Sequence, residues 1–361
     1  MTRSRGIVLF EKLICNIFNK SLWDMSELDY AKQAQRFYQQ APTIILGSGA
    51  SAAFGLSGMG ALATHLLQSI DLSRSDGASK DKWQQFSEML NNGKDLETAL
   101  HEVRLPADLT EQVVHLTWKL LNPQDIDVFN QSIQQSNFFP LSELVSSLFR
   151  SALNEINIIT TNYDRLAEYA VEQAGHHHYT GFSHGFCRTQ KGTEHIRCNR
   201  IVKILKVHGS LDWFISPLND IVGYSHLNLI PDNHIPKIVT PGIEKYSATY
   251  HEPFRTIINL ADNAIRNATS YLCIGFGFND EHIQEKLVEK CVRENACITL
   301  ITHGLTNSAR DFLLSGKVKN FLAIECGKEH SGSVIYSSEA TSPVFVDDDY
   351  WSLKGYLKLV C

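Results

Sequence analysis

Short apolar runs alternate with helical segments along most of this chain, and that alternation constrains the fold more than any other feature. Runs typical of buried strands lie at 43–46, 157–160, 203–208, 238–240, 270–276 and 296–302. Segments with helical spacing lie between several of them, at 164–174, 254–268 and 281–293. Alternating strands and helices form a parallel sheet, because each helix returns the chain to the same end of the sheet. We therefore predict a doubly wound, mostly parallel, Rossmann-like α/β sheet.

Other segments add to this sheet. Apolar residues at helical spacing indicate a helical insertion at about 60–150, and residues 176–236, which are rich in Gly, His, Ser and Asn, indicate a loop-rich lobe. Residues 1–40 have helical patterning in two stretches, 7–17 and 26–40, and form an N-terminal segment. Residues 306–361 are predicted to pack on the core or on a partner.

Composition limits the partners and the compartment. A formal net charge of -6 and a pI near 6.2 give no global attraction to nucleic acid or anionic membranes, so direct binding to either is not predicted. Eight cysteines lie scattered without a C-x-x-C pair, which favours buried reduced thiols over a zinc ribbon, and no metal is predicted. No apolar run approaches the roughly 18 residues of a membrane span, and no secretory segment is visible, so we predict a cytoplasmic protein.

The segment Gly47-Ser48-Gly49-Ala50-Ser51 directly follows the first apolar run. Its glycines permit a tight turn and a close backbone approach, and a following helix would offer N–H groups to an anion, as in a phosphate-binding loop. The G-x-G-x-x-G spacing ends on Ala52 instead of glycine, and no Gly-Lys-Ser/Thr follows, which argues against a kinase or ATPase. An ordinary turn therefore stays an alternative.

Two further polar motifs lie at the ends of apolar runs. Thr161-Asn162-Tyr163-Asp164 follows the run at 157–160, and His208-Gly209-Ser210 closes the run at 203–208. Each motif has a structural alternative: Asn162 or Asp164 would cap the next helix, and His208 would be a core imidazole bonded to the backbone. Because open α/β sheets bind ligands at the carboxyl ends of their strands, three motifs at such ends predict one shared site.

Together with a fourth segment, these motifs resemble those of bacterial sirtuin-like (Sir2-family) proteins. The matching segments, in the family's order, are Gly47-Ser48-Gly49-Ala50-Ser51, Thr161-Asn162-Tyr163-Asp164, His208-Gly209-Ser210-Leu211-Asp212-Trp213 and Ile274-Gly275-Phe276-Gly277-Phe278-Asn279-Asp280. The resemblance spans about residues 41–305 and is greatest to the prokaryotic branch associated with antiphage defence. It implies a sirtuin-like NAD-binding domain that degrades NAD as its substrate.

The resemblance also implies a role for each matching residue. The residues that contact NAD would be Gly47, Gly49, Ala50 and Ser51 at the phosphates, Gly275 and Gly277 near the adenosine half, and Thr161. The catalytic residues would be Asn162 and Asp164 in the nicotinamide and ribose pocket, and His208 as the base.

Two departures from the family pattern bear on the reaction. Family deacetylases carry Phe-Arg after the glycine loop, where this chain has Leu56-Ser57-Gly58-Met59, and four zinc-binding cysteines, which are missing here. That zinc module supports the cleft for an acyl peptide, so lysine deacylation ranks third. An NAD glycohydrolase that releases nicotinamide and ADP-ribose ranks first, and a non-catalytic module that senses NAD or ADP-ribose ranks second.

The residue types are compatible with cleavage of the bond between nicotinamide and ribose. The pyridinium leaves as a neutral molecule and needs little acid assistance, whereas an ordinary glycoside needs a carboxylic acid to protonate its leaving oxygen. An amide and a base are therefore expected. Asn162 would hold the carboxamide or a water, His208 would accept a proton near neutral pH, and Asp164 would stabilise positive charge on the ribose. No carboxylate cluster with metal-ligand spacing supports a nuclease.

An enzyme that consumes NAD would be toxic without control, and the chain shows no obvious sensor domain. The resemblance therefore implies a homo-oligomer and a complex with a HerA-type hexameric ATPase. Two polar clusters are left outside the site. His176-His177-His178 is predicted as a solvated loop, and Asn279-Asp280 as the cap of the helix at 281–293.

Overall fold

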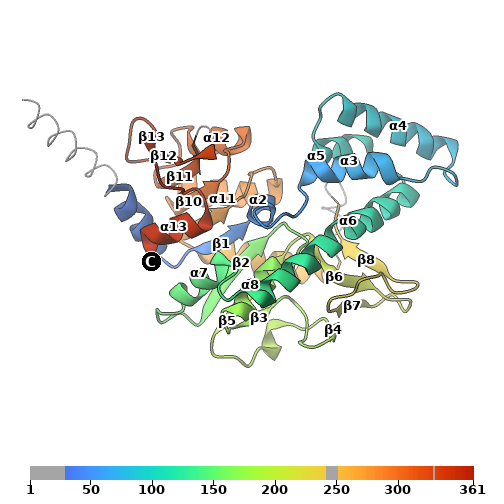
Figure 1. The fold of residues 1–361 in the computed structure, drawn as a ribbon, viewed down its shortest axis with the longest axis horizontal. Coiled ribbons are helices and arrows are strands. Elements are labelled where there is room, and N and C mark those ends of the chain that lie inside the picture. The colour runs from blue at the N-terminus through green and yellow to red at the C-terminus, as the bar shows by residue number, and fades with distance from the viewer. Residues whose placement is uncertain (1–28, 241–250, 328–329) are drawn as a thin grey trace, which may run out of the picture.

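The computed structural model describes residues 29–240, 251–327 and 330–361, so the helix expected at 7–17 lies outside the described residues. Its centre is a nine-stranded sheet in the order β13-β12-β11-β10-β9-β1-β2-β5-β3 (Figure 1). The strands span Thr43–Leu46 (β1), Glu155–Thr160 (β2), His177–Tyr179 (β3), Ile201–Lys206 (β5), Ser270–Ile274 (β9), Cys297–Thr302 (β10), Phe321–Cys326 (β11), Ser333–Ser337 (β12) and Val344–Val346 (β13). Every pair from β11 to β3 is parallel, which confirms the mostly parallel sheet.

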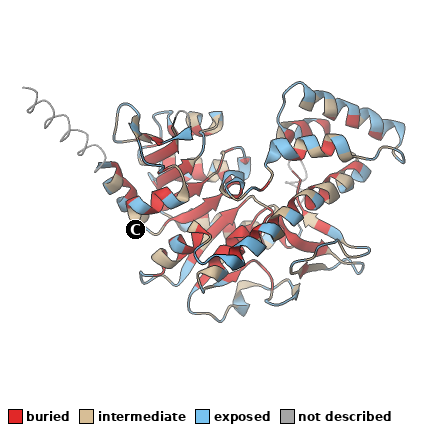
Figure 2. Cartoon of the chain, viewed as in Figure 1, coloured by how far each residue is buried: buried red, intermediate tan, exposed pale blue. Residues whose placement is uncertain are grey.

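Helices cover both faces of this sheet, so the doubly wound prediction is confirmed. One face carries α7 (Pro140–Leu148), α8 (Leu166–Gln173), α13 (Leu353–Val360) and the helix at 29–38, and the other carries α10 (Phe254–Asn267), α11 (Glu281–Arg293) and α12 (Asn307–Leu313). Consecutive strand residues serve opposite faces: Ile44 packs in the first core and Ile45 in the second. Burial on both faces accounts for the continuous apolar runs in the sequence, and Figure 2 shows the sheet as the most buried layer.

The strand order reverses direction at β1. The chain passes from β1 to β2 on one side, and it later returns to β9 on the other side of β1. The carboxyl ends of β1 and β9 therefore form a topological switch point, where open α/β sheets leave a crevice for ligands. The glycine loop follows β1 at this point, and Gly275 follows β9.

The two loops at the switch point are in direct backbone contact. The N–H of Gly47 donates to the carbonyl oxygen of Ile274 at 3.0 Å, and the N–H of Gly49 donates to that of Gly275 at 3.1 Å. Gly275 has a φ of +57°, and a Cβ added there would lie 2.3 Å from the Ala50 nitrogen. Close backbone packing, together with a left-handed turn, thus requires these glycines.

We predict that Gly275→Ala lowers the free energy of unfolding by about 2–6 kcal/mol, because strain at positive φ and a backbone overlap each cost roughly 1–3 kcal/mol. Urea unfolding of the purified chain measures the change. The matched control is Gly304→Ala, because a Cβ at Gly304 would meet no atom within 4 Å. Equal midpoints for the two variants would contradict the packing argument.

A helical lobe lies between β1 and β2. After the short helix α2 (Ser48–Ala52), it comprises α3 (Met59–Ser69), α4 (Gly77–Asn91), α5 (Leu96–Val103) and the long α6 (Ala107–Gln134). Residues from α3, α4, α5 and the start of α6 share a core of their own, which includes Trp83 and Phe86. Figure 1 shows α3–α5 standing away from the central sheet, with α6 leading back to it.

Residues 176–240 are more regular than predicted. The strand expected at 238–240 in the parallel sheet is wrong: β8 (Ile235–Ile238) belongs to a separate antiparallel sheet with the order β4-β7-β6-β8. The other strands are β4 (Cys187–Thr189), β6 (Gly209–Ile215) and β7 (Ile221–Tyr224). Buried Trp118 of α6 donates from Nε1 to the carbonyl oxygen of Leu211 at 2.6 Å and thereby attaches this sheet to the helical lobe.

The C-terminal residues continue the central sheet through β11, β12 and β13. Buried Gln33, from the helix at 29–38, contacts them by donating to the carbonyl oxygen of Phe321 at 3.2 Å and accepting from Ser337 at 2.7 Å. The division into segments 1–40, 41–305 and 306–361 stays a prediction. Within the described ranges, none of the helices combines the length and the hydropathy that a bilayer crossing requires.

Candidate functional site

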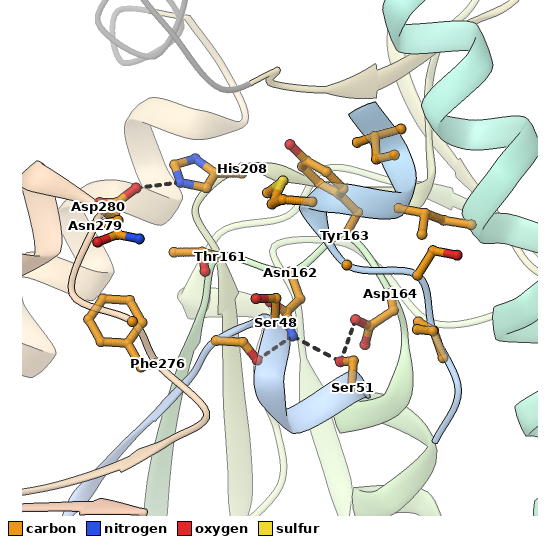
Figure 3. A pocket seen from close by; sticks show the side chains of 18 of the residues that line it. Ser48, Ser51, Thr161, Asn162, Tyr163, Asp164, His208, Phe276, Asn279 and Asp280 are labelled. Atoms are coloured by element: carbon orange, nitrogen blue, oxygen red, sulfur yellow. Dashed lines mark hydrogen bonds and ion pairs between the residues drawn. The ribbon is translucent and has the colours of Figure 1, made fainter. Parts of the chain in front are cut away.

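A cavity of about 160 Å³ opens at the switch point (Figure 3). Its floor comes from the loops after β1, β2, β5 and β9, and includes Gly47, Asn162 and His208. Its other wall comes from the helical lobe and includes Met59 and Glu97. The structure therefore brings together the amide and the imidazole that lie 46 positions apart in the sequence and that the family resemblance assigns to one site.

Asn162 is fixed by its amide nitrogen. Nδ2 donates to the carbonyl oxygen of Gly47 and to Oγ of Ser51, each at 2.9 Å, and its backbone N–H donates to Oγ1 of Thr160 at 3.0 Å. Both amide hydrogens are used in these bonds, so Oδ1 is the side-chain atom that can bind a ligand or a water. The arrangement presents an acceptor oxygen to the cavity.

Asp164 supports this amide through Ser51. The Ser51 hydroxyl donates to Oδ2 of Asp164 at 2.6 Å while it accepts from Asn162, and Oδ1 of Asp164 accepts from the N–H of Leu166 at 3.2 Å. Burial raises the pKa of the Asp164 carboxyl, and Lys206 and Ser51 act in the opposite direction. These bonds make Asp164 an anchor for the loop and the start of α8, which is close to the capping alternative drawn from the sequence.

His208 lies two residues beyond β5 and pairs with a carboxylate. Its Nε2 lies 2.7 Å from Oδ2 of Asp280, and both side chains are nearly buried, at 12% and 8% exposure. An ionised carboxylate can only accept, so this bond places the proton on Nε2 and leaves the lone pair on Nδ1. A carboxylate that orients an imidazole in this way also stabilises the imidazolium that forms when Nδ1 takes a proton.

Asp280 is a cavity residue that the sequence analysis left outside the candidate site. The prediction that it caps a helix is confirmed, because Oδ1 accepts from the N–H of Ile283 at the start of α11, at 3.1 Å. The cap occupies one carboxylate oxygen, and the other contacts His208. The structure therefore brings Asp280 to the candidate site, in contact with His208. The available signal was its place at the end of the Ile274–Asp280 motif, directly after β9.

The other predicted residues distribute over two adjoining cavities. Thr161 and Gly277 line the first cavity. Gly49, Ala50 and Gly275 line a second one of about 590 Å³, which shares Ser51, Asn162 and Asp164 with the first. The two cavities are thus adjacent at these three shared residues.

The glycine loop differs from an open phosphate cradle. The N–H groups of Gly47 and Gly49 donate to the loop after β9, and that of Ala50 donates to the carbonyl oxygen of Gly47 at 3.0 Å. These three donors are already used by the backbone in this conformation. Their assignment to the NAD phosphates stays a prediction.

Tyr163 shapes the cavity beside Asn162. Its hydroxyl donates to the carbonyl oxygen of Val239 at 2.8 Å, and burial, with smaller contributions from Glu97 and Asp280, raises its pKa. The histidine tract is also more ordered than the solvated loop that was predicted, because His178 is buried within β3. Burial lowers the pKa of His178 to about 4.

Comparisons with known proteins found a matching family model and a set of similar solved structures. Solved structures similar to this chain include a Sir2 homolog–NAD complex (14% identity, 78% of this chain and 82% of that chain covered, TM-score 0.41) and Sir2Tm bound to a propionylated peptide (14%, 78% and 86%, 0.40). No curated protein matches the chain in sequence. Residues 156–297 match the SIR2-like domain, a range that contains Asn162, His208 and Asp280 but not the glycine loop. Residues 156–297 are therefore similar to the SIR2-like domain, and they lie within a doubly wound α/β fold.

Proposed function

We propose that this protein is an NAD glycohydrolase that converts NAD and water to ADP-ribose, nicotinamide and a proton. The observation that carries the proposal is the meeting of Asn162 and the His208–Asp280 pair in one cavity at the switch point of the sheet. Dinucleotides bind at such switch points in doubly wound folds. The SIR2-like match over residues 156–297 supports NAD as the substrate.

In the proposed reaction, the bond between C1′ of the ribose and the nicotinamide nitrogen breaks, and its electron pair neutralises the pyridinium. Oδ1 of Asn162 accepts a hydrogen bond from the attacking water and orients it toward C1′. As the new C–O bond forms, His208 takes the proton of the water on Nδ1, and Asp280 stabilises the resulting imidazolium. Asp164 holds Ser51, which in turn holds the Asn162 amide.

We expect Asp280→Asn to reduce kcat for nicotinamide release by up to about 10⁴-fold, because the imidazole loses the carboxylate that holds its tautomer and orientation. Asparagine remains a good helix cap, so α11 is retained and the free energy of unfolding changes little. The rate of nicotinamide release measures the first effect, and urea unfolding measures the second.

Asp262→Asn is the matched control for that experiment. Asp262 accepts from His282 at 3.1 Å and also pairs with Lys286, and none of these three residues lines the cavity. The control removes an Asp–His contact of the same chemistry and is expected to leave kcat unchanged. A similar loss in both variants would assign Asp280 a purely structural role.

Three assays separate glycohydrolysis from the two alternatives. Nicotinamide release from NAD alone, with ADP-ribose as the second product, is the expected result. Release that occurs only with an acyl-lysine peptide would identify a deacylase instead. Saturable NAD binding measured by calorimetry, with no release in any condition, would identify a sensor.

The oligomer, the HerA-type ATPase partner and the antiphage role rest on the family resemblance alone, and we retain them as proposals. The expected result is a complex of defined mass when the chain is co-expressed with such an ATPase, measured by light scattering. Nicotinamide release per chain should then rise on assembly. A monomeric chain whose activity is indifferent to the ATPase would contradict the partner proposal without affecting the chemistry.

A further inference from the structure

A second group of polar side chains lies at the carboxyl end of the sheet, away from the His208 site. His303 directly follows β10 and Cys326 ends β11. These two strands pair in parallel with Thr302 opposite Glu325, and the N–H of Cys326 donates to the carbonyl oxygen of His303 at 3.2 Å. The backbones that carry the imidazole and the thiol are therefore neighbours in a regular ladder.

His330 joins them from the hairpin loop between β11 and β12. The hairpin is closed by the pairing of Cys326 with Ser333 and by a hydrogen bond of 2.9 Å from the Gly327 N–H to the carbonyl oxygen of Gly332. His330 has a φ of +61°, a conformation that non-glycine residues rarely adopt. Its ring stacks on that of His303, with centroids 5.3 Å apart and planes 23° apart.

The three side chains bring metal-ligating atoms together. One nitrogen of His303, one nitrogen of His330 and the sulfur of Cys326 all lie within 4.8 Å of one another. Tetrahedral ligands with Zn–N bonds of about 2.0 Å and a Zn–S bond of about 2.3 Å lie roughly 3.3–3.5 Å apart. Both imidazoles are exposed, so small side-chain rotations can close the difference.

We propose that His303, Cys326 and His330 bind a divalent transition metal ion, with Zn²⁺ as the preferred ion. Two neutral imidazoles and one thiolate are the ligand set that zinc accepts, and three protein ligands leave the fourth tetrahedral position to water or another ligand. Binding releases the thiol proton, and the ion links β10, β11 and the hairpin loop.

This site adjoins the larger cavity. His303 and Trp351 both line the 590 Å³ cavity, and their rings meet edge to face at 5.3 Å. A bound ion would fix His303, and through it the Trp351 ring, at the rim of that cavity. The site is separate in its residues from the His208–Asp280 pair, so its proposal does not depend on the proposed reaction.

The full-length chain, stripped of metal by a chelator and desalted, is titrated with Zn²⁺ and separately with Co²⁺. The expected result is one ion bound per chain, and for Co²⁺ a near-ultraviolet thiolate charge-transfer band with intense tetrahedral bands in the visible region. Cys326→Ser should abolish the charge-transfer band. His303→Asn and His330→Asn should each weaken Co²⁺ binding by more than about 100-fold, beyond the usual cost of losing an outer-shell partner.

Cys187→Ser is the matched control, because Cys187 is an exposed cysteine on β4 of the other sheet. It should keep the Co²⁺ spectrum and the stoichiometry. The proposed site would be refuted if the Co²⁺ charge-transfer band persists in Cys326→Ser or is lost in Cys187→Ser. It would also be refuted if the wild-type chain shows no such band. Circular dichroism of each metal-free variant checks folding, and if Cys326→Ser unfolds, the two exposed histidine variants decide the outcome.

Discussion

His208→Ala is expected to reduce kcat for nicotinamide release by about 10²–10⁴-fold, which is the range that a positioned general base contributes. The loss should appear in kcat more than in KM, because the imidazole acts on the proton that moves in the transition state. Asn162→Ala should give a loss of similar size, since water would no longer be held in line with C1′. The rate of nicotinamide release by each variant is measured by chromatography of the reaction products.

Combining the two substitutions tests whether they act in one step. If the two side chains act in one step, removing either one abolishes the rate contribution of both. The double variant should therefore be little slower than either single variant. His195→Ala, at an exposed position in the lobe of the small sheet, is the control and should keep the full rate. Full activity in His208→Ala, with folding retained, would refute the proposed base.

Lys206→Met is expected to lower the free energy of unfolding by about 3–5 kcal/mol, the cost of leaving one member of a buried ion pair without its partner. The Lys206 side chain is fully buried, and its Nζ donates to Oε1 of Glu168 at 3.0 Å and to the carbonyl oxygen of Asp164. Burial already raises the pKa of Glu168, and Lys206 opposes that rise. Without Lys206, the Glu168 carboxylate must protonate or force local opening.

Lys203→Met is the matched control on the same strand. Lys203 also pairs with a glutamate, Glu155, at 2.6 Å, but the side chains are 17% and 41% exposed. An exposed pair contributes about 0–1 kcal/mol, so this change should have little effect in urea unfolding. The double variant Lys206→Met/Glu168→Leu should recover more than half of the loss, because it removes the whole pair. Equal effects of Lys203→Met and Lys206→Met would refute the assignment.

The elements that burial dictates on both sheet faces were predictable from sequence. The runs at 43–46 and 296–302 are β1 and β10, because uninterrupted apolar residues suit a strand covered by helices on both sides. An apolar run at 321–324 carried the same signal and is the start of β11. The three-residue strand β3 carried none, because its His177–Tyr179 sequence at the sheet edge is largely polar.

The sequence did not specify which strands pair or which side chains meet in the tertiary structure. The residues at 238–240 have the pattern of a parallel strand, but hydropathy does not specify which sheet a short strand joins, and neighbouring β8 pairs with β6. In the sequence, a helix cap is a sufficient explanation of Asp280. Its contact with His208, 72 positions earlier in the chain, is visible only in the folded structure. Likewise, the Ser51–Asp164 bond gives Asp164 an anchoring partner that its motif does not indicate.

The helical lobe has a consequence for how such a protein changes its choice of ligand. Met59, Leu62 and Glu97 belong to a unit with its own core, whereas Asn162 and His208 stand on the rigid ends of the sheet. Exchanging or grafting α3–α5 would therefore reshape the entrance while the reacting groups keep their positions. The lobe is in this sense a modular part, through which the ligand selectivity of the proposed site can be redesigned independently of Asn162 and His208.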